Sequence, residues 1–158
     1  MQKIGLGYDS HRLAPNRPLI LCGVRVPSDL GLEGHSDADA ALHAITDAIF
    51  GALADGDLGD HFPDSDPKWK DADSKAFLTF AMDLLRQRGM KVANCDVTIM
   101  LQQPKLSQYK PAMRKRTAEI MGIDPAVVSI KAKTNEHMGF VGRGEGVAAL
   151  AAVLLTDD

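Results

Sequence analysis

Three side chains in the first third of the sequence could together bind a metal ion. Asp9 and His11 are separated by one residue, so on an extended strand both point to the same face. His43 lies in a segment with helical spacing of apolar residues. One carboxylate and two imidazoles suit zinc, and three protein ligands leave the fourth position open, as in catalytic sites. The alternative is that Asp9 only makes backbone hydrogen bonds where a strand ends.

Two more carboxylates share the face of the helical segment that carries His43. Asp39 lies four residues before it and Asp47 four residues after it. Either one could orient the imidazole by a hydrogen bond, as carboxylates often do for metal-bound histidines. The face could instead be simply exposed to solvent, but the surrounding alanines leave little bulk and favour close approach by another element.

A glycine-rich segment near the end of the chain has the composition of a phosphate-binding site. Residues 131–146 read KAKTNEHMGFVGRGEG, and glycines let a backbone approach a ligand closely. Lys131, Lys133 and Arg143 suit phosphate groups, and Glu136 offers a hard oxygen ligand for Mg²⁺. The segment has no GxxxxGK[ST] pattern and is therefore not a Walker A loop. A flexible hairpin is the alternative interpretation.

Strands and helices that could position these residues alternate along the chain. We expect strands at 4–9, 19–26, 91–101 and 127–133, and helices at 38–53, 74–88 and 108–121, with Ser36 and Ser74 as N-caps. Residues 28–34 are expected to form a loop, and the apolar end, 146–155, suits strand or helix. The alternation predicts one α/β or α+β domain over 1–158, with helices on one face of a sheet.

The segment 55–73 is rich in aspartate, proline and glycine, which predicts a loop. So long a loop in a compact domain is often a lid or a binding loop, although a solvated acidic linker is the simpler alternative. We expect 61–70 to be mobile without ligand.

Composition excludes several classes of function. The chain has 158 residues, 45% of them hydrophobic, and a net charge of -3, which argues against nucleic acid as the main partner. Cys22 and Cys95 form no CxxC pair, so we expect neither a disulfide nor a thiolate zinc site. No apolar run reaches the roughly 20 residues of a membrane span, and the start shows no signal segment. The expected location is the bacterial cytoplasm.

Three separated motifs resemble one enzyme family. GYDSHR, GHSDADAALHAITDAIFGALADGDLGDHFPD and KAKTNEHMGFVGRGEG, together with GVRVP and QQPKL, are similar in order and spacing to the 2-C-methyl-D-erythritol 2,4-cyclodiphosphate synthases. The resemblance implies a lyase of the non-mevalonate isoprenoid pathway. It would close 4-diphosphocytidyl-2-C-methyl-D-erythritol 2-phosphate into a cyclic diphosphate and release CMP. The implied nucleophile is the substrate's own 2-phosphate, which attacks the β-phosphorus.

The resemblance also implies roles for individual residues. Asp9, His11 and His43 would bind zinc, and Glu136 would hold a second divalent ion, Mg²⁺ or Mn²⁺. His35, Lys133 and Thr134 complete the implied catalytic group. The implied substrate contacts are His35, Ser36, Asp57, Gly59, Asp64, Leu101, Pro104, Lys105, Leu106, Ser107, Lys133, Thr134, Asn135, Glu136, Phe140 and Arg143. Lys133 and Leu101 depart from the family pattern, which often has threonine and alanine there.

The family fold implied is a two-layer α/β sandwich of the α+β class, with a mixed, mostly antiparallel four-stranded sheet and helices on one face. The last apolar segment would then be a strand. Three subunits would assemble with active sites between them, and a phosphate or isoprenoid diphosphate could lie in the central cavity near Arg143. Two other functions remain open on the residues alone: a zinc hydrolase, and a binding protein for a nucleotide or an isoprenoid phosphate.

Overall fold

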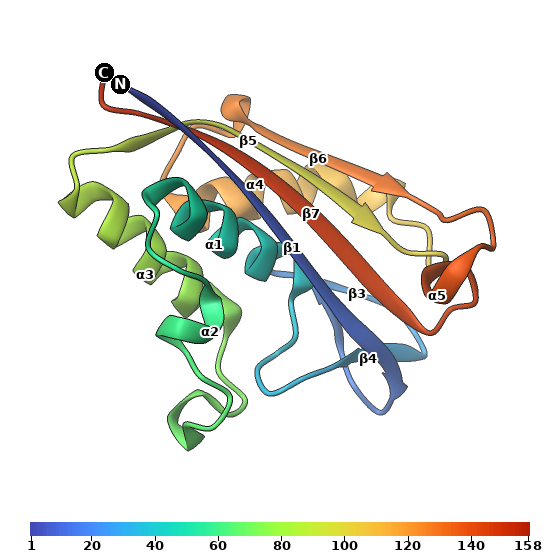
Figure 1. Cartoon of the computed structure of the whole chain (residues 1–158). Helices are drawn as coiled ribbons and strands as arrows, with labels where there is room; N and C mark the ends of the chain where they lie inside the picture. Colours follow the sequence, from blue (N-terminus) through green and yellow to red (C-terminus); the bar gives the residue numbers. More distant parts are fainter.

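The computed structural model describes residues 1–158 and is built on a five-stranded mixed sheet. Its strand order is β4 (Leu30–Glu33), β1 (Gln2–Pro15), β7 (Gly146–Thr156), β5 (Lys91–Met100) and β6 (Val128–Lys133). Neighbouring strands are antiparallel except for β5 and β6, which are parallel. The termini lie side by side because β1 and β7 pair along almost their whole length (Figure 1).

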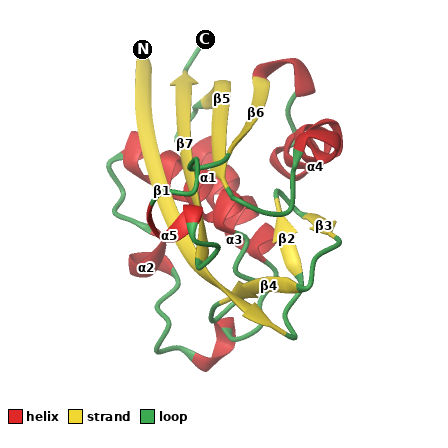
Figure 2. Cartoon of the chain, turned by 90° about the vertical axis from the view of Figure 1, so that its right-hand side faces the viewer, coloured by secondary structure: helices red, strands yellow, loops and turns green.

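Three long helices cover one face of this sheet (Figure 1). α1 (Ala40–Leu53) packs on β1 and β7, α3 (Ser74–Gln87) packs on α1, and α4 (Lys110–Met121) packs on β6. The remaining elements are α2 (Leu58–His61), α5 (Gly139–Gly142), the hairpin of β2 (Leu19–Leu21) and β3 (Val24–Val26), and short 3-10 turns at Pro67–Trp69, Ser107–Tyr109 and Pro125–Val127. Figure 2 shows the hairpin apart from the main sheet, between β4 and α4. No helix is long and apolar enough to span a membrane.

The side chains of β1 alternate between the two faces of the sheet. Gly5, Gly7, Asp9 and His11 face the helices, because residues two apart on a strand share a face. Large apolar side chains on the opposite face are exposed to solvent: Ile4, Leu6, Tyr8 and, on β7, Leu150. The single large core therefore lies between the sheet and the helices, and the other sheet face is left uncovered.

Helix α1 lies unusually close to β1 because two glycines occupy the contact. A Cβ atom added to Gly5 would lie 1.8 Å from the carbonyl oxygen of Ala48. A Cβ atom added to Gly7 would lie 1.9 Å from the carbonyl oxygen of Ala44. Both distances are far below any van der Waals contact, so the helix backbone occupies the space where a side chain would be. This contact places the first turns of α1 directly over β1.

The structure corrects the four-stranded sheet expected from the sequence. Residues 30–33, expected to lie in a loop, form the edge strand β4, which pairs with the far end of β1 from Arg12↔Glu33 to Pro15↔Leu30. β1 is correspondingly much longer than the expected 4–9. The expected strand at 19–26 is a hairpin, because Cys22 and Gly23 adopt positive φ values of 53° and 68° and form its turn. The last segment is a strand, as the family resemblance implied.

Both helix starts differ from the expected N-caps. Asp39, rather than Ser36, caps α1 and accepts a hydrogen bond from the backbone N of Leu42 at 3.1 Å. Asp73 caps α3, and Ser74 is the first residue of that helix. Aspartate and serine are equally good caps chemically, so residue type alone does not decide between them. The acidic loop at 55–73 also contains α2, which is capped by Asp57.

We predict that Gly7→Ala lowers the free energy of unfolding by about 1–3 kcal/mol or more, because overpacking against a backbone carbonyl cannot be relieved by a side-chain rotation. Gly51→Ala is the matched control. It lies in α1 with its nearest neighbour 3.8 Å from the added Cβ, and should be neutral or stabilising by up to about 1 kcal/mol. Urea unfolding of both variants tests this. Equal stability of the two variants would contradict the close contact.

Candidate active site

The helix–strand contact brings Asp9, His11 and His43 together as the ligand cluster. Nε2 of His11 lies 2.7 Å from Oδ2 of Asp9, and Nδ1 of His43 lies 3.0 Å from the same oxygen. The two histidine nitrogens are 3.3 Å apart. All the ligand atoms lie within 4.8 Å of one another, so one metal ion could contact all three. The structure thus supports the sequence-based grouping of these residues.

The proton positions on His11 follow from its other partner. Its Nδ1 lies 3.0 Å from the backbone oxygen of Glu33 on β4, and a carbonyl can only accept a hydrogen bond. Nδ1 therefore carries the proton. While Nε2 also carries a proton, it donates to Asp9; once that proton is lost, as metal binding requires, its lone pair faces Asp9 and His43. Strand β4, which the sequence did not reveal, thus determines the orientation of a ligand.

The electrostatics of the ligand cluster favour a cation. Burial acts to raise the pKa of Asp9, but hydrogen bonds and charge attraction from His11 and His43 outweigh it and lower the pKa to about 2. Burial is the largest single effect on His11 and acts to lower its pKa. The hydrogen bond and charge attraction of Asp9, with smaller contributions from the Glu33 backbone and Asp39, together outweigh burial and raise the pKa. Asp9 is therefore ionised at neutral pH and ready to bind a metal.

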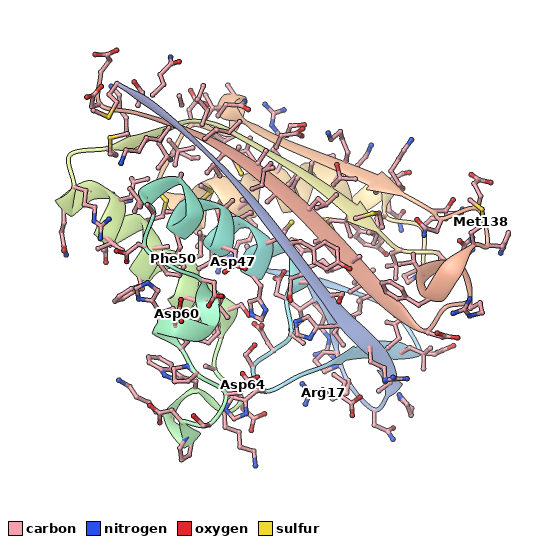
Figure 3. The ribbon with its side chains drawn as sticks, viewed as in Figure 1. Arg17, Asp47, Phe50, Asp60, Asp64 and Met138 are labelled. Carbon is pink, nitrogen blue, oxygen red and sulfur yellow. The ribbon has the colours of Figure 1, made fainter.

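The ligand cluster opens into a cavity of about 320 Å³. One wall carries Gly34, His35 and Ser36, and the acidic loop contributes Asp64. Figure 3 shows Asp64 on the side of the molecule where the acidic loop lies. The cavity also has an apolar wall, which was not expected from the sequence; its residues are Leu58, Phe62, Trp69 and Phe77. The signal available was the unusual presence of Phe62 and Trp69 in an otherwise polar loop.

Arg17 supports the wall that carries His35 and Ser36. Its Nη2 donates to the backbone oxygen of Ser36 at 3.2 Å, and its Nε donates to the backbone oxygen of Leu32 at 3.0 Å. The guanidinium therefore bridges β4 and the segment that leads into α1.

His43 is oriented by residues other than those expected. Its Nε2 lies 2.7 Å from Oγ of Ser74 and 3.2 Å from Oγ of Ser36. Ser74 is fully buried, and it enters from α3, far away in the sequence. Nothing in the local spacing could have paired Ser74 with His43.

The expectation that Asp39 or Asp47 orients His43 is wrong. Asp39 is fully buried, and its carboxylate accepts from the backbone N of Cys22 at 2.9 Å and of Gly23 at 2.7 Å, besides capping α1. Burial raises the pKa of Asp39 to about 6. Oδ1 of Asp47 accepts from the backbone N of Leu58 at 2.7 Å and so anchors α2. Both carboxylates are structural.

A second group of expected site residues lines another cavity, of about 190 Å³. The expected residues in it are Leu101, Lys105, Leu106, Ser107, Lys133 and Thr134. Pro104 instead lines a neighbouring cavity beside the β3–β4 connection. Asn135 donates to the backbone oxygen of Met138 at 3.3 Å. Oγ1 of Thr134 lies 3.4 Å from Oε1 of Glu136, so the Glu136 carboxylate lies next to a residue that lines this cavity.

The remaining expected residues lie elsewhere. Asp57 and Gly59 belong to the start of α2, where Asp57 accepts from the backbone N of Asp60 at 3.0 Å. Phe140 lines a cavity of about 250 Å³ that also contacts His11. Arg143 is exposed and pairs with Glu145, with Nε 2.7 Å from Oε1.

A single chain does not bring these two groups together. Strands β7 and β5 lie between β1, which carries Asp9 and His11, and β6, which leads to Thr134 and Glu136. In Figure 3, Met138, which follows this segment, lies across the molecule from Asp64. The ligand cluster and the Thr134–Glu136 segment are therefore parts of two separate cavities.

Together, the fold and the ligand cluster define an α+β protein with an open metal-binding pocket at a helix–strand contact. The chain belongs to the YgbB family, whose model matches residues 2–156. A relative from Symbiobacterium thermophilum named 2-C-methyl-D-erythritol 2,4-cyclodiphosphate synthase is 55% identical over 152 residues, which are 96% of this chain and 97% of the relative.

Solved structures give the same result. A 2C-methyl-D-erythritol-2,4-cyclodiphosphate synthase in a CDP-bound form has a TM-score of 0.90 and 40% identity, with 98% of this chain and 100% of that chain covered. The bifunctional IspDF from Campylobacter jejuni has a TM-score of 0.94 and 42% identity, but the match spans 98% of this chain and only 42% of that chain.

We predict that His43→Ala abolishes stoichiometric metal binding, because it removes one of three ligands and one of the two imidazole partners of Asp9. Asp47→Asn is the control one turn further along α1. It keeps an oxygen for the backbone N of Leu58, so its metal content should match the parent. Metal analysis after dialysis against Zn²⁺ distinguishes the two. Full metal occupancy in His43→Ala would overturn the assignment of the ligand cluster.

Proposed function

We propose that this chain, acting as one domain of residues 1–158, converts 4-diphosphocytidyl-2-C-methyl-D-erythritol 2-phosphate to 2-C-methyl-D-erythritol 2,4-cyclodiphosphate and releases CMP. The observation that carries the proposal is the ligand cluster of Asp9, His11 and His43, which lines an open cavity and contains an ionised carboxylate. It occurs in a chain that matches synthases of this name over nearly its full length. The bacterial cytoplasm is the proposed location.

The ligand cluster fits zinc by its chemistry. Asp9 supplies an ionised carboxylate, and His11 supplies a lone pair whose direction is settled by Glu33. When bound there, zinc would supply Lewis-acid polarisation of phosphate oxygens. His35 and Ser36 would hold the phosphate at the methylerythritol end of the substrate, since both line the same cavity.

The apolar wall of this cavity has a separate role. Phe62 is almost fully buried, and its ring contacts Trp69 at 4.8 Å and Phe77 at 4.5 Å between centroids. This wall limits access of water to the phosphates, which strengthens the electrostatic interactions in the cavity. It would also favour cyclisation over hydrolysis, because the nucleophile is the substrate's own phosphate.

The second cavity is the proposed cytidine site. Backbone groups of the turn at 101–107 would read the base edge, and Lys133 and Thr134 would contact the diphosphate. Glu136 would hold a second divalent ion, Mg²⁺ or Mn²⁺, on the same diphosphate. No protein nucleophile is needed, so the residues of both cavities act by positioning and neutralising charge.

We further propose a homotrimer with each active site shared between two subunits. Two observations support this assembly: the two cavities lie apart in one chain, and the exposed apolar face of the sheet has no cover of its own. A phosphate or isoprenoid diphosphate in the central cavity near Arg143 would have to compete with Glu145, which already pairs with that guanidinium.

Phosphorus NMR of the reaction products tests the proposed function. We expect signals of CMP and of a cyclic diphosphate when the protein is incubated with substrate, Zn²⁺ and Mg²⁺. A linear phosphate product would identify a hydrolase, and unchanged substrate would identify a binding protein. Either result would overturn the proposal.

Subunit mixing tests the shared sites. His43→Ala and Thr134→Ala should each be nearly inactive, because each damages one half of the site. Exchange of subunits between the two variants should restore part of the activity, since some interfaces then receive two intact halves. As a control, mixing with a tagged parent protein shows whether subunits exchange. Proven exchange without recovery, or a monomer in light scattering, would rule out the arrangement.

A further inference from the structure

The imidazole of His43 has partners on both sides. Its Nδ1 faces the ligand cluster, 3.0 Å from Oδ2 of Asp9, and its Nε2 faces Oγ of Ser74 at 2.7 Å. Ser74 is fully buried and is the first residue of α3. Oγ of Ser36 lies further from Nε2, at 3.2 Å. Ser74 is thus the closer partner for the outer nitrogen of His43.

The hydrogen-bond chain continues from Ser74 to Asp37. Oδ2 of Asp37 accepts from the backbone N of Ser74 at 3.1 Å, and Oδ1 accepts from the backbone N of Asp39 at 3.1 Å. Oγ of Ser74 also donates to Oδ1 of Asp37. The hydroxyl proton of Ser74 is therefore directed to the carboxylate, and its oxygen lone pair faces His43.

This hydrogen-bond direction assigns the tautomer of the neutral His43 ring. A lone pair on Oγ of Ser74 can only accept, so Nε2 of His43 must donate and must carry the ring proton. Nδ1 of the neutral ring is then left with its lone pair toward Asp9 and His11. The chain Asp37–Ser74–His43 consequently presents Nδ1 to a metal, and no carboxylate contacts Nε2 directly.

We propose that Ser74 and Asp37 are positioning residues that act as a relay, holding His43 in its metal-binding orientation. The inference rests on the proposed metal site and does not depend on which substrate binds there.

The relay also joins two loops. Backbone bonds from Asp71 to His35 at 2.7 Å and from Asp37 to Ala72 at 3.1 Å connect the end of the acidic loop to the same segment. The orientation of a metal ligand is thus coupled to the end of that loop.

Removal of the Ser74 hydroxyl should leave the fold intact. Asp73 caps α3 and accepts from the backbone N of Lys75 at 2.9 Å, and this cap does not involve the Ser74 side chain. Alanine is also a better helix former than serine. Ser74→Ala is therefore a test of the relay rather than of α3.

Thr79→Ala is the matched control. Thr79 lies on the same helix, and its hydroxyl donates to the backbone oxygen of Lys75 at 2.8 Å, exposed to solvent. We expect Ser74→Ala to bind Zn²⁺ roughly 10–100-fold more weakly in chelator competition, the usual effect of losing an outer partner of a metal-bound histidine. Its Co²⁺-substituted form should show an altered visible absorption spectrum. Thr79→Ala should match the parent in both measurements.

Asp37→Asn provides a second, independent variant and completes a double-mutant cycle. Both residues act through one chain of hydrogen bonds. The double variant should therefore lose no more Zn²⁺ affinity than the single variant with the larger loss. Additive losses would overturn the relay, as would Ser74→Ala with parental Zn²⁺ affinity and Co²⁺ spectrum. A parent protein that binds no Zn²⁺ would overturn the metal site itself, and the relay with it.

Discussion

The contact between α1 and β1 through Gly5 and Gly7 is the constraint on which the site depends. The carbonyl oxygens of Ala44 and Ala48 occupy the positions of the missing side chains, so helix and strand meet backbone to backbone. His43 precedes Ala44 directly. Asp9 and His11 continue the same face of β1 beyond Gly7. The separation of the three ligands is therefore set by a packing contact that contains no ligand. A change in the packing of α1 on β1 would also change the geometry of the site.

Two aspartates near this contact have the same side chain but different pKa values and different roles, because their surroundings differ. Asp9 is partly buried, but two imidazoles contact it, and its pKa falls to about 2. Asp39 is buried among backbone N–H groups without a cation in contact, and burial raises its pKa to about 6. The first is available to a metal ion. The second fastens the β2–β3 turn to the start of α1 and keeps that helix in place.

Sequence reasoning found what is encoded locally. The i, i+2 spacing of Asp9 and His11, and the helical spacing around His43, gave both the elements and the ligand grouping. It missed β4, because a four-residue edge strand between turns carries little periodicity of its own. It also missed Ser74 as a partner of His43, because that contact depends on how α3 packs on α1. The choice of Asp39 or Asp47 as that partner followed helix geometry, which says nothing about a third element.

The pairing of β1 with β7 from Gln2↔Thr156 onward has a consequence for protein architecture. The amino group of Met1 pairs with the carboxylate of Asp157, so both termini leave the molecule at one corner. Asp9 lies about 23 Å along β1 from Gln2 at the usual rise of a strand. A second domain can therefore be fused to either end without approaching the ligand cluster, which suits relatives such as the bifunctional IspDF. The same adjacency makes this fold a natural candidate for circular permutation, with a short linker closing Asp158 onto Met1 and new ends opened in an exposed turn.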